Sequence, residues 1–70
     1  MKNAEIKFLI YCIETYKSAR NLTGKQIIAL FDKYGVIAYI VNCYGALHTM
    51  GDNYIVEDID SFIEIRKSEI

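Results

Sequence analysis

TGKQIIALFDKYG, residues 23–35, carries the clearest local signal in this 70-residue chain. Thr23 and Gln26 have the spacing of a capping box, in which each side chain accepts a hydrogen bond from the other residue's backbone N–H. Gly35 favours a left-handed cap at the far end, because it has no Cβ to clash there. Between the caps an apolar stripe at helical spacing contains Ile27, Leu30, Phe31 and Tyr34. The segment therefore predicts an amphipathic helix with both ends fixed.

The preceding segment predicts a longer helix from about Asn3 to Arg20. Asn3 is of a residue type preferred at the N-cap, and Asn21 is expected to end the helix. Lys17 and Arg20 lie in the last turn, where the helix dipole favours positive charge. The apolar stripe contains Ile6, Leu9, Ile10, Ile13 and Tyr16.

A third helix is expected over about residues 36–48, and this segment is apolar nearly all round. One side carries Val36, Ile40, Cys43, Tyr44 and Leu47. Such a helix lies at the centre of a fold or is covered by a partner. The many β-branched residues leave a β-strand as the alternative.

The C-terminal part predicts a short extended segment, Tyr54-Ile55-Val56, followed by a last helix. Asp58 is expected to cap that helix, with Asp60 also near its positive end and Lys67 near its negative end. The apolar stripe of the helix contains Ile59, Phe62 and Ile63.

Together these segments predict an all-α fold: a small orthogonal bundle of about four helices in one domain, residues 1–70, with an extended segment at 54–56. The chain contains no proline, which favours helices with short connections. A chain of this length buries only about 60% of its unfolded surface. Because 53% of its residues are apolar, we expect a protein partner or a second copy to cover part of it.

Charge is divided unevenly along the chain. Residues 1–33 carry six basic and three acidic side chains, a net +3, and residues 34–70 carry two basic and six acidic, a net −4. No Lys or Arg lies between Lys33 and Arg66. Segments 23–34 and 36–47, joined at Gly35, have helix-turn-helix spacing, but the second has no cation for DNA. A DNA-binding regulator is therefore the alternative function, and it would use Lys7, Lys17, Arg20, Lys25 and Lys33.

The residues that could carry chemistry are few. One His and two distant Cys match no zinc pattern, and no glycine-rich phosphate loop is present. Cys43 and His48 are five residues apart, which places them poorly on one helical face for nucleophilic catalysis. We therefore expect no enzyme activity, no metal and no cofactor. The two free cysteines and the short apolar runs favour a cytoplasmic protein without a membrane segment.

Six tyrosines in so short a chain favour an interface, because tyrosine packs its ring while its hydroxyl stays polar. An acidic turn and final helix would add electrostatic specificity for a partner. The predicted partner-binding residues are Tyr39, Tyr44, His48, Tyr54, Glu57 and Asp58.

Three stretches also resemble a known family. They are EIKFLIYCIE (5–14), LTGK (22–25) with LFDKYGV (30–36), and ALHTMG (46–51) leading into YIVEDI (54–59). Together they resemble a family of short bacterial proteins, domain of unknown function 3791. The resemblance assigns no catalytic residues. It implies a companion role beside proteins similar to ADP-ribosyltransferase-like toxins, and therefore an antitoxin-like or accessory subunit.

Overall fold

Helix α2, Gly24–Tyr34, forms as its capping pattern predicts. The computed structural model describes residues 2–69, so Met1 and Ile70, the ends of the predicted domain, lie outside the described residues. Thr23 Oγ1 accepts from the Gln26 N–H at 3.1 Å, and Gln26 Oε1 accepts from the Thr23 N–H at 2.9 Å. Gly35 adopts φ 70°, which confirms the left-handed cap.

Helix α1, Asn3–Arg20, has the predicted length, but the expected cap at Asn3 is wrong. Lys2 is the N-cap residue and Asn3 is already helical. Glu5 Oε1 accepts a hydrogen bond of 2.8 Å from the Lys2 N–H, so an acidic side chain of the first turn satisfies this backbone donor. Asn21 ends the helix in the left-handed conformation at φ 54°, as predicted.

The predicted third helix is helical rather than extended, but it is interrupted. Helix α3, Val36–Asn42, ends at Cys43, and the short helix α4, Tyr44–Leu47, follows. Cys43 has φ −102° and ψ 17°, and the Ala46 N–H reaches back three residues to the Cys43 carbonyl at 3.0 Å. Asn42 and Gly45 flank the break, and both residue types have low helix propensity.

The extended segment expected at 54–56 and the cap expected at Asp58 are both wrong. Helix α5, Asp52–Glu69, begins six residues earlier than expected and contains both. Ile55, Ile59 and Ile63 recur every four residues and are all buried. This one-sided burial favours a helix more than the β propensity of the Tyr-Ile-Val triplet favours a strand.

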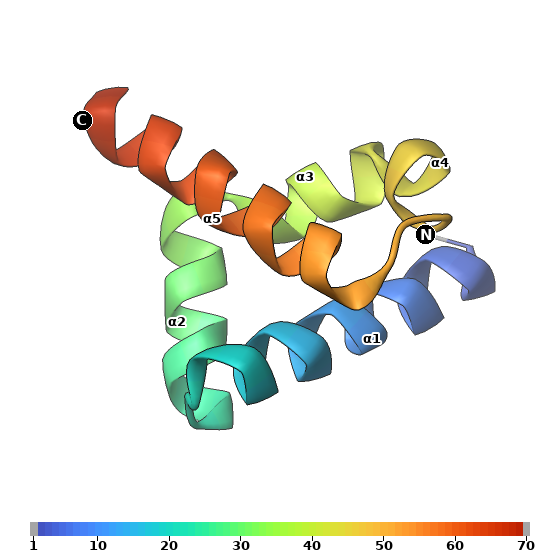
Figure 1. Cartoon of the computed structure of the whole chain (residues 1–70), viewed down its shortest axis with the longest axis horizontal. Helices are drawn as coiled ribbons and strands as arrows, with labels where there is room; N and C mark the ends of the chain where they lie inside the picture. The colour runs from blue at the N-terminus through green and yellow to red at the C-terminus, as the bar shows by residue number, and fades with distance from the viewer. Residues whose placement is uncertain (1, 70) are drawn as a thin grey trace.

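The described residues confirm the all-α class: α1, α2, α3 and α5 surround one core, and α4 is a single turn. In Figure 1, α1 and α5 run along the molecule, α5 passes in front of α3, and α2 crosses at one end. Within residues 2–69, no helix is both long and apolar enough to cross a membrane. The core consists of Cys12, Tyr16, Ile27, Phe31, Val36, Ile40, Ile55, Val56, Ile59 and Ile63.

Candidate functional site

Tyr39 on α3 is held by two residues one turn apart on α5. Its hydroxyl donates a hydrogen bond of 2.5 Å to Asp58 Oδ2, and its ring stacks on Phe62 with centroids 4.1 Å apart and planes 17° apart. Burial raises the pKa of Tyr39, and the hydrogen bond to Asp58 and the charge of Asp58 raise it further. The phenol is therefore neutral at physiological pH. Asp58 accepts its hydrogen bond, and the proton stays on the Tyr39 oxygen.

Tyr54 lies beside this contact and lines a shallow depression on the surface of α5. The depression has a volume of about 260 Å³ and is lined by Tyr54, Glu57, Asp58 and Ser61. These residues are three, four and seven positions apart, so they share one helical face. Tyr54 is 50% exposed and Glu57 is exposed, whereas Asp58 is half-buried against Tyr39. The depression therefore combines an aromatic wall with two carboxylates.

Tyr44 and His48 form a second group at the other end of α3. Their rings stack with centroids 4.4 Å apart and planes 6° apart, and the Phe8 ring of α1 meets Tyr44 edge-on at 5.5 Å. His48 Nδ1 lies 2.7 Å from the Tyr44 carbonyl oxygen. Because a carbonyl can only accept, Nδ1 carries the proton in this contact. This stack attaches α4 to the first half of α1.

The structure thus brings together four of the six predicted binding residues, Tyr39, Tyr54, Glu57 and Asp58, and leaves Tyr44 and His48 in the stack with Phe8. The sequence pattern did not identify Ser61 as a neighbour of Glu57, or Phe62 as the ring beneath Tyr39. The four-residue spacing of Ile55, Ile59 and Ile63 in the sequence is typical of a helix across this whole segment. A helix beginning at Asp52 would have placed Ser61 and Phe62 one turn from Glu57 and Asp58.

The carboxylate of Asp60, also on α5, contacts two residues of α1. It accepts a hydrogen bond of 2.5 Å from the Tyr16 hydroxyl and forms an ion pair with Arg20, both on α1. Burial alone would raise the pKa of Asp60, but the hydrogen bonds from Arg20 and Tyr16, together with the charge of Arg20, lower it. Asp60 therefore holds α5 against α1, whereas Glu57 is directed to the surface.

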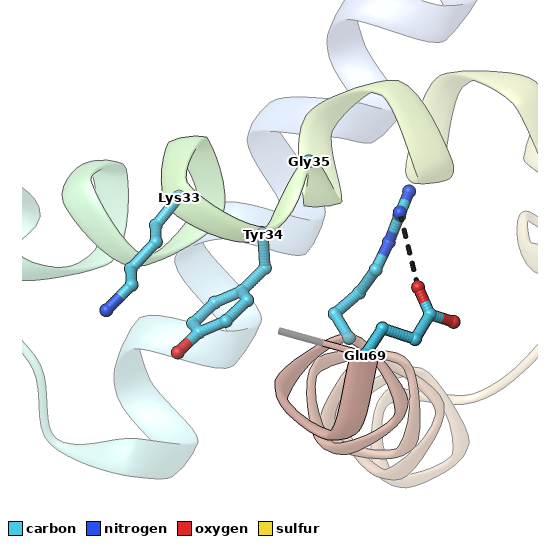
Figure 2. A pocket seen from close by; sticks show the side chains of 5 residues that line it. Lys33, Tyr34, Gly35 and Glu69 are labelled. Carbon is cyan, nitrogen blue, oxygen red and sulfur yellow. Dashed lines mark ion pairs between the residues drawn. The ribbon is translucent and has the colours of Figure 1, made fainter.

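A second depression, of about 310 Å³, lies where α2 ends and α5 finishes (Figure 2). Lys33, Tyr34 and Gly35 form one side, and Arg66 and Glu69 form the other. Arg66 Nη1 lies 3.9 Å from Glu69 Oε2, and its guanidinium also lies over the Phe62 ring at 5.0 Å. Arg66 is close to Gly35, at the carbonyl end of α2, where a cation is favoured by the dipole. Apart from the approach of Arg66 to Gly35, these contacts join residues of α5 to one another.

The two cysteines differ in environment. Cys12 is fully buried in the core, and burial raises the pKa of its thiol to about 11. A thiol with this pKa is a poor nucleophile at neutral pH, because little thiolate is present. Cys43 is partly buried at the break between α3 and α4. Among residues 2–69, no three His, Cys, Asp or Glu side chains are grouped closely enough to hold a metal ion.

No curated protein and no solved structure matches this chain. The model of one family, described as a protein of unknown function (DUF3791), matches residues 7–66. This match includes α2, α3, α4, most of α1 and all four residues of the α5 depression. The chain therefore belongs to the DUF3791 family, as the resemblance of its sequence predicted.

Proposed function

We propose that this chain is a small protein-binding module that presents the first half of α5 to a positively charged surface of a partner. The observation that carries the proposal is the depression on α5, where the exposed ring of Tyr54 adjoins Glu57 and Asp58. Exposed tyrosines are enriched among the residues that contribute most to protein interfaces. Nearby carboxylates would favour a partner of opposite charge and increase its association rate.

Two features make this face suitable for docking. The Tyr39 hydroxyl and the Phe62 ring fix the position of Asp58 and of α5, so little conformational entropy would be lost there on binding. Within α5, five acidic residues precede the first cation, Arg66, and one of them, Asp60, is paired with Arg20 of α1. We propose no catalytic role and no cofactor for this face. The free thiols Cys12 and Cys43 are consistent with a reducing compartment such as the cytoplasm.

The proposal extends to the identity of the partner. The family resemblance favours an ADP-ribosyltransferase-like toxin as the first partner to test, with this chain as its antitoxin-like companion. In this role the α5 face would cover a basic surface of the toxin, and Tyr54 would serve as the aromatic anchor.

The test is a binding titration of such a toxin domain with three forms of the chain: wild type, Tyr54→Ala and Tyr11→Ala. Tyr11 is the matched control, because it is a tyrosine of similar exposure, 41%, on α1. We expect Tyr54→Ala to weaken binding by about tenfold or more and Tyr11→Ala to change it by less than about twofold. Equal losses in the two variants, or no binding by the wild type, would reject the proposal.

The alternative, a DNA-binding regulator, would depend on the basic N-terminal half. Two of its five cations already have acidic neighbours: Arg20 is paired with Asp60, and Lys17 lies 3.9 Å from Glu14. Duplex binding that weakens steeply with salt, and that Lys25→Glu with Lys33→Glu abolishes, would favour this alternative over protein binding.

A further inference from the structure

A groove lies between the second half of α1 and the first half of α5, where the two helices pack against each other (Figure 1). It consists of two neighbouring depressions, of about 430 and 210 Å³, which have three lining residues in common: Ala19, Asn53 and Val56. The larger depression is also lined by Glu14, Thr15, Ser18 and Asp52, and the smaller one by Arg20 and Glu57. We call the two depressions together the α1–α5 groove.

The uncharged residues of the groove suit a polypeptide backbone lying along it. Val56 is only 6% exposed and Ala19 ends at its Cβ, so the floor is short and apolar. The hydroxyls of Thr15 and Ser18 and the amide of Asn53 also line the groove, and each can donate or accept a hydrogen bond. An extended segment of another protein presents N–H and C=O groups that need such partners.

The charge at the rim of the groove is negative. Glu14, Asp52 and Glu57 are all exposed and each contributes a carboxylate. Lys17 lies 3.9 Å from Glu14 without lining the groove, and the Glu14 side chain stays 65% exposed. A segment that carries lysine or arginine is therefore complementary to this rim, and an acidic segment would be repelled.

Two positive features near the groove are offset within the molecule. Among the described residues that line it, Arg20 is the one cation, and Arg20 is ion-paired with Asp60. The N-terminus of α5 is the positive end of a helix dipole, but Asp52 lies in its first turn and compensates it. The excess negative charge therefore comes from Glu14 in the larger depression and Glu57 in the smaller one.

Glu57 also connects the groove with the depression beside Tyr54, because it lines both. Asn53 and Tyr54 are consecutive residues of α5 and thus about 100° apart around the helix, so the two hollows lie on adjacent sides of α5. A segment with a basic side chain beside Tyr54 can therefore pass over Glu57 and continue across α5 toward α1.

We propose that the α1–α5 groove receives an extended, basic segment of the protein partner. Its lysine or arginine side chains pair with Glu14 and Glu57, and its backbone lies over Ala19 and Val56. Such binding rests on the function proposed above, because it specifies which part of a positively charged partner is recognised. It also adds α1 to the binding surface, which the Tyr54 depression alone does not require.

The test reverses the charge at one position in the groove. Ala19 is exposed and lines both depressions, so Ala19→Glu and Ala19→Lys form a pair of variants with similar length and helix propensity but opposite charge. The probe is a short fluorescent peptide of alternating lysine and alanine, titrated at low salt and followed by anisotropy. We expect Ala19→Glu to bind it about two- to fivefold more tightly than the wild type, and Ala19→Lys about two- to fivefold more weakly.

Two further substitutions control for net charge and for added bulk. Ala38 is exposed on α3 and does not line the groove, so Ala38→Glu and Ala38→Lys change the net charge elsewhere. Glu14→Gln removes a rim charge at constant size and should weaken binding by about two- to fivefold. Equal responses at positions 19 and 38, no binding by the wild type, or equally tight binding of a glutamate–alanine peptide would overturn the proposal.

Failure of the groove and failure of the proposed function give different results. Suppose that Tyr54→Ala weakens binding of the toxin domain while Ala19→Lys changes binding of neither the toxin domain nor the peptide. The groove is then rejected and the function of the Tyr54 depression stands. A loss of peptide binding in Ala19→Lys, with toxin binding unchanged in Tyr54→Ala, would have the opposite meaning.

Discussion

At the scale of single residues, the Tyr16 hydroxyl joins the core to the charge network of α5. The Tyr16 ring is buried against Phe31, and its hydroxyl donates to Asp60. We expect Tyr16→Phe to lower the free energy of unfolding by about 1 kcal/mol, because it removes a hydrogen bond to a charged acceptor and keeps the packing. Urea unfolding followed by circular dichroism measures this loss. Tyr54→Phe is the control, since Tyr54 is half exposed; a comparable loss there would contradict the assignment.

The same hydroxyl predicts a dependence on alkaline pH. Burial raises the pKa of Tyr16 from 10.0 to about 12, and the hydrogen bond and charge of Asp60 contribute to the shift. The unfolded chain therefore loses this proton before the folded chain does, and ionisation favours unfolding. We expect the stability difference between wild type and Tyr16→Phe to be full below pH 10 and to shrink as the pH rises toward 12. Urea midpoints of both proteins at pH 8 and pH 11 test this sign, and a difference that grows with pH would refute it.

At the scale of helices, two glycines should respond to the same substitution with opposite signs. Gly35 joins α2 to α3 at φ 70°, so an alanine there would be strained by about 1–2 kcal/mol. A Cβ at Gly35 would meet Arg66 at an ordinary 3.8 Å, so the expected loss is conformational rather than steric. Gly45 lies within α4 with nothing within 4 Å of an added Cβ, and Gly45→Ala should stabilise by about 0.5 kcal/mol. Thermal midpoints measured side by side test the pair; stabilisation by Gly35→Ala would be inconsistent with the cap.

The helices differ in how well the sequence predicted them, and the reason is physical. Helix α2 has both ends fixed by its own residues, Thr23, Gln26 and Gly35, so local sequence was sufficient. The start of α5 depends instead on burial of Ile55 against other helices, and local β propensity gave the wrong answer there. The break at Cys43 likewise depends on where α4 packs, since the aromatic contacts of Tyr44 are with Phe8 and His48.

The candidate site was predictable in composition but not in geometry. Residue type and charge alone predict the members of the site: Tyr39, Tyr54, Glu57 and Asp58. The contact between Tyr39 and Asp58 joins positions 19 apart, and that between Tyr16 and Asp60 joins positions 44 apart. Contacts of this kind follow from how complete helices pack, and no local spacing rule contains them. Among the acidic residues of α5, the fold therefore decides which hold helices together, as Asp58 and Asp60 do, and which are exposed, as Glu57 is.

At the scale of the whole molecule, one carboxylate connects the packing of the helices with the exposed surface of α5. Asp58 accepts the hydrogen bond from Tyr39 on α3 and also lines the depression beside Tyr54. We therefore expect Asp58→Ala to lower the free energy of unfolding by about 1–2 kcal/mol as well as to weaken binding, whereas Tyr54→Ala should weaken binding with little change in stability. Urea unfolding of both variants, measured beside the binding titration, separates the two effects. Equal losses of stability in the two variants would contradict this division of roles.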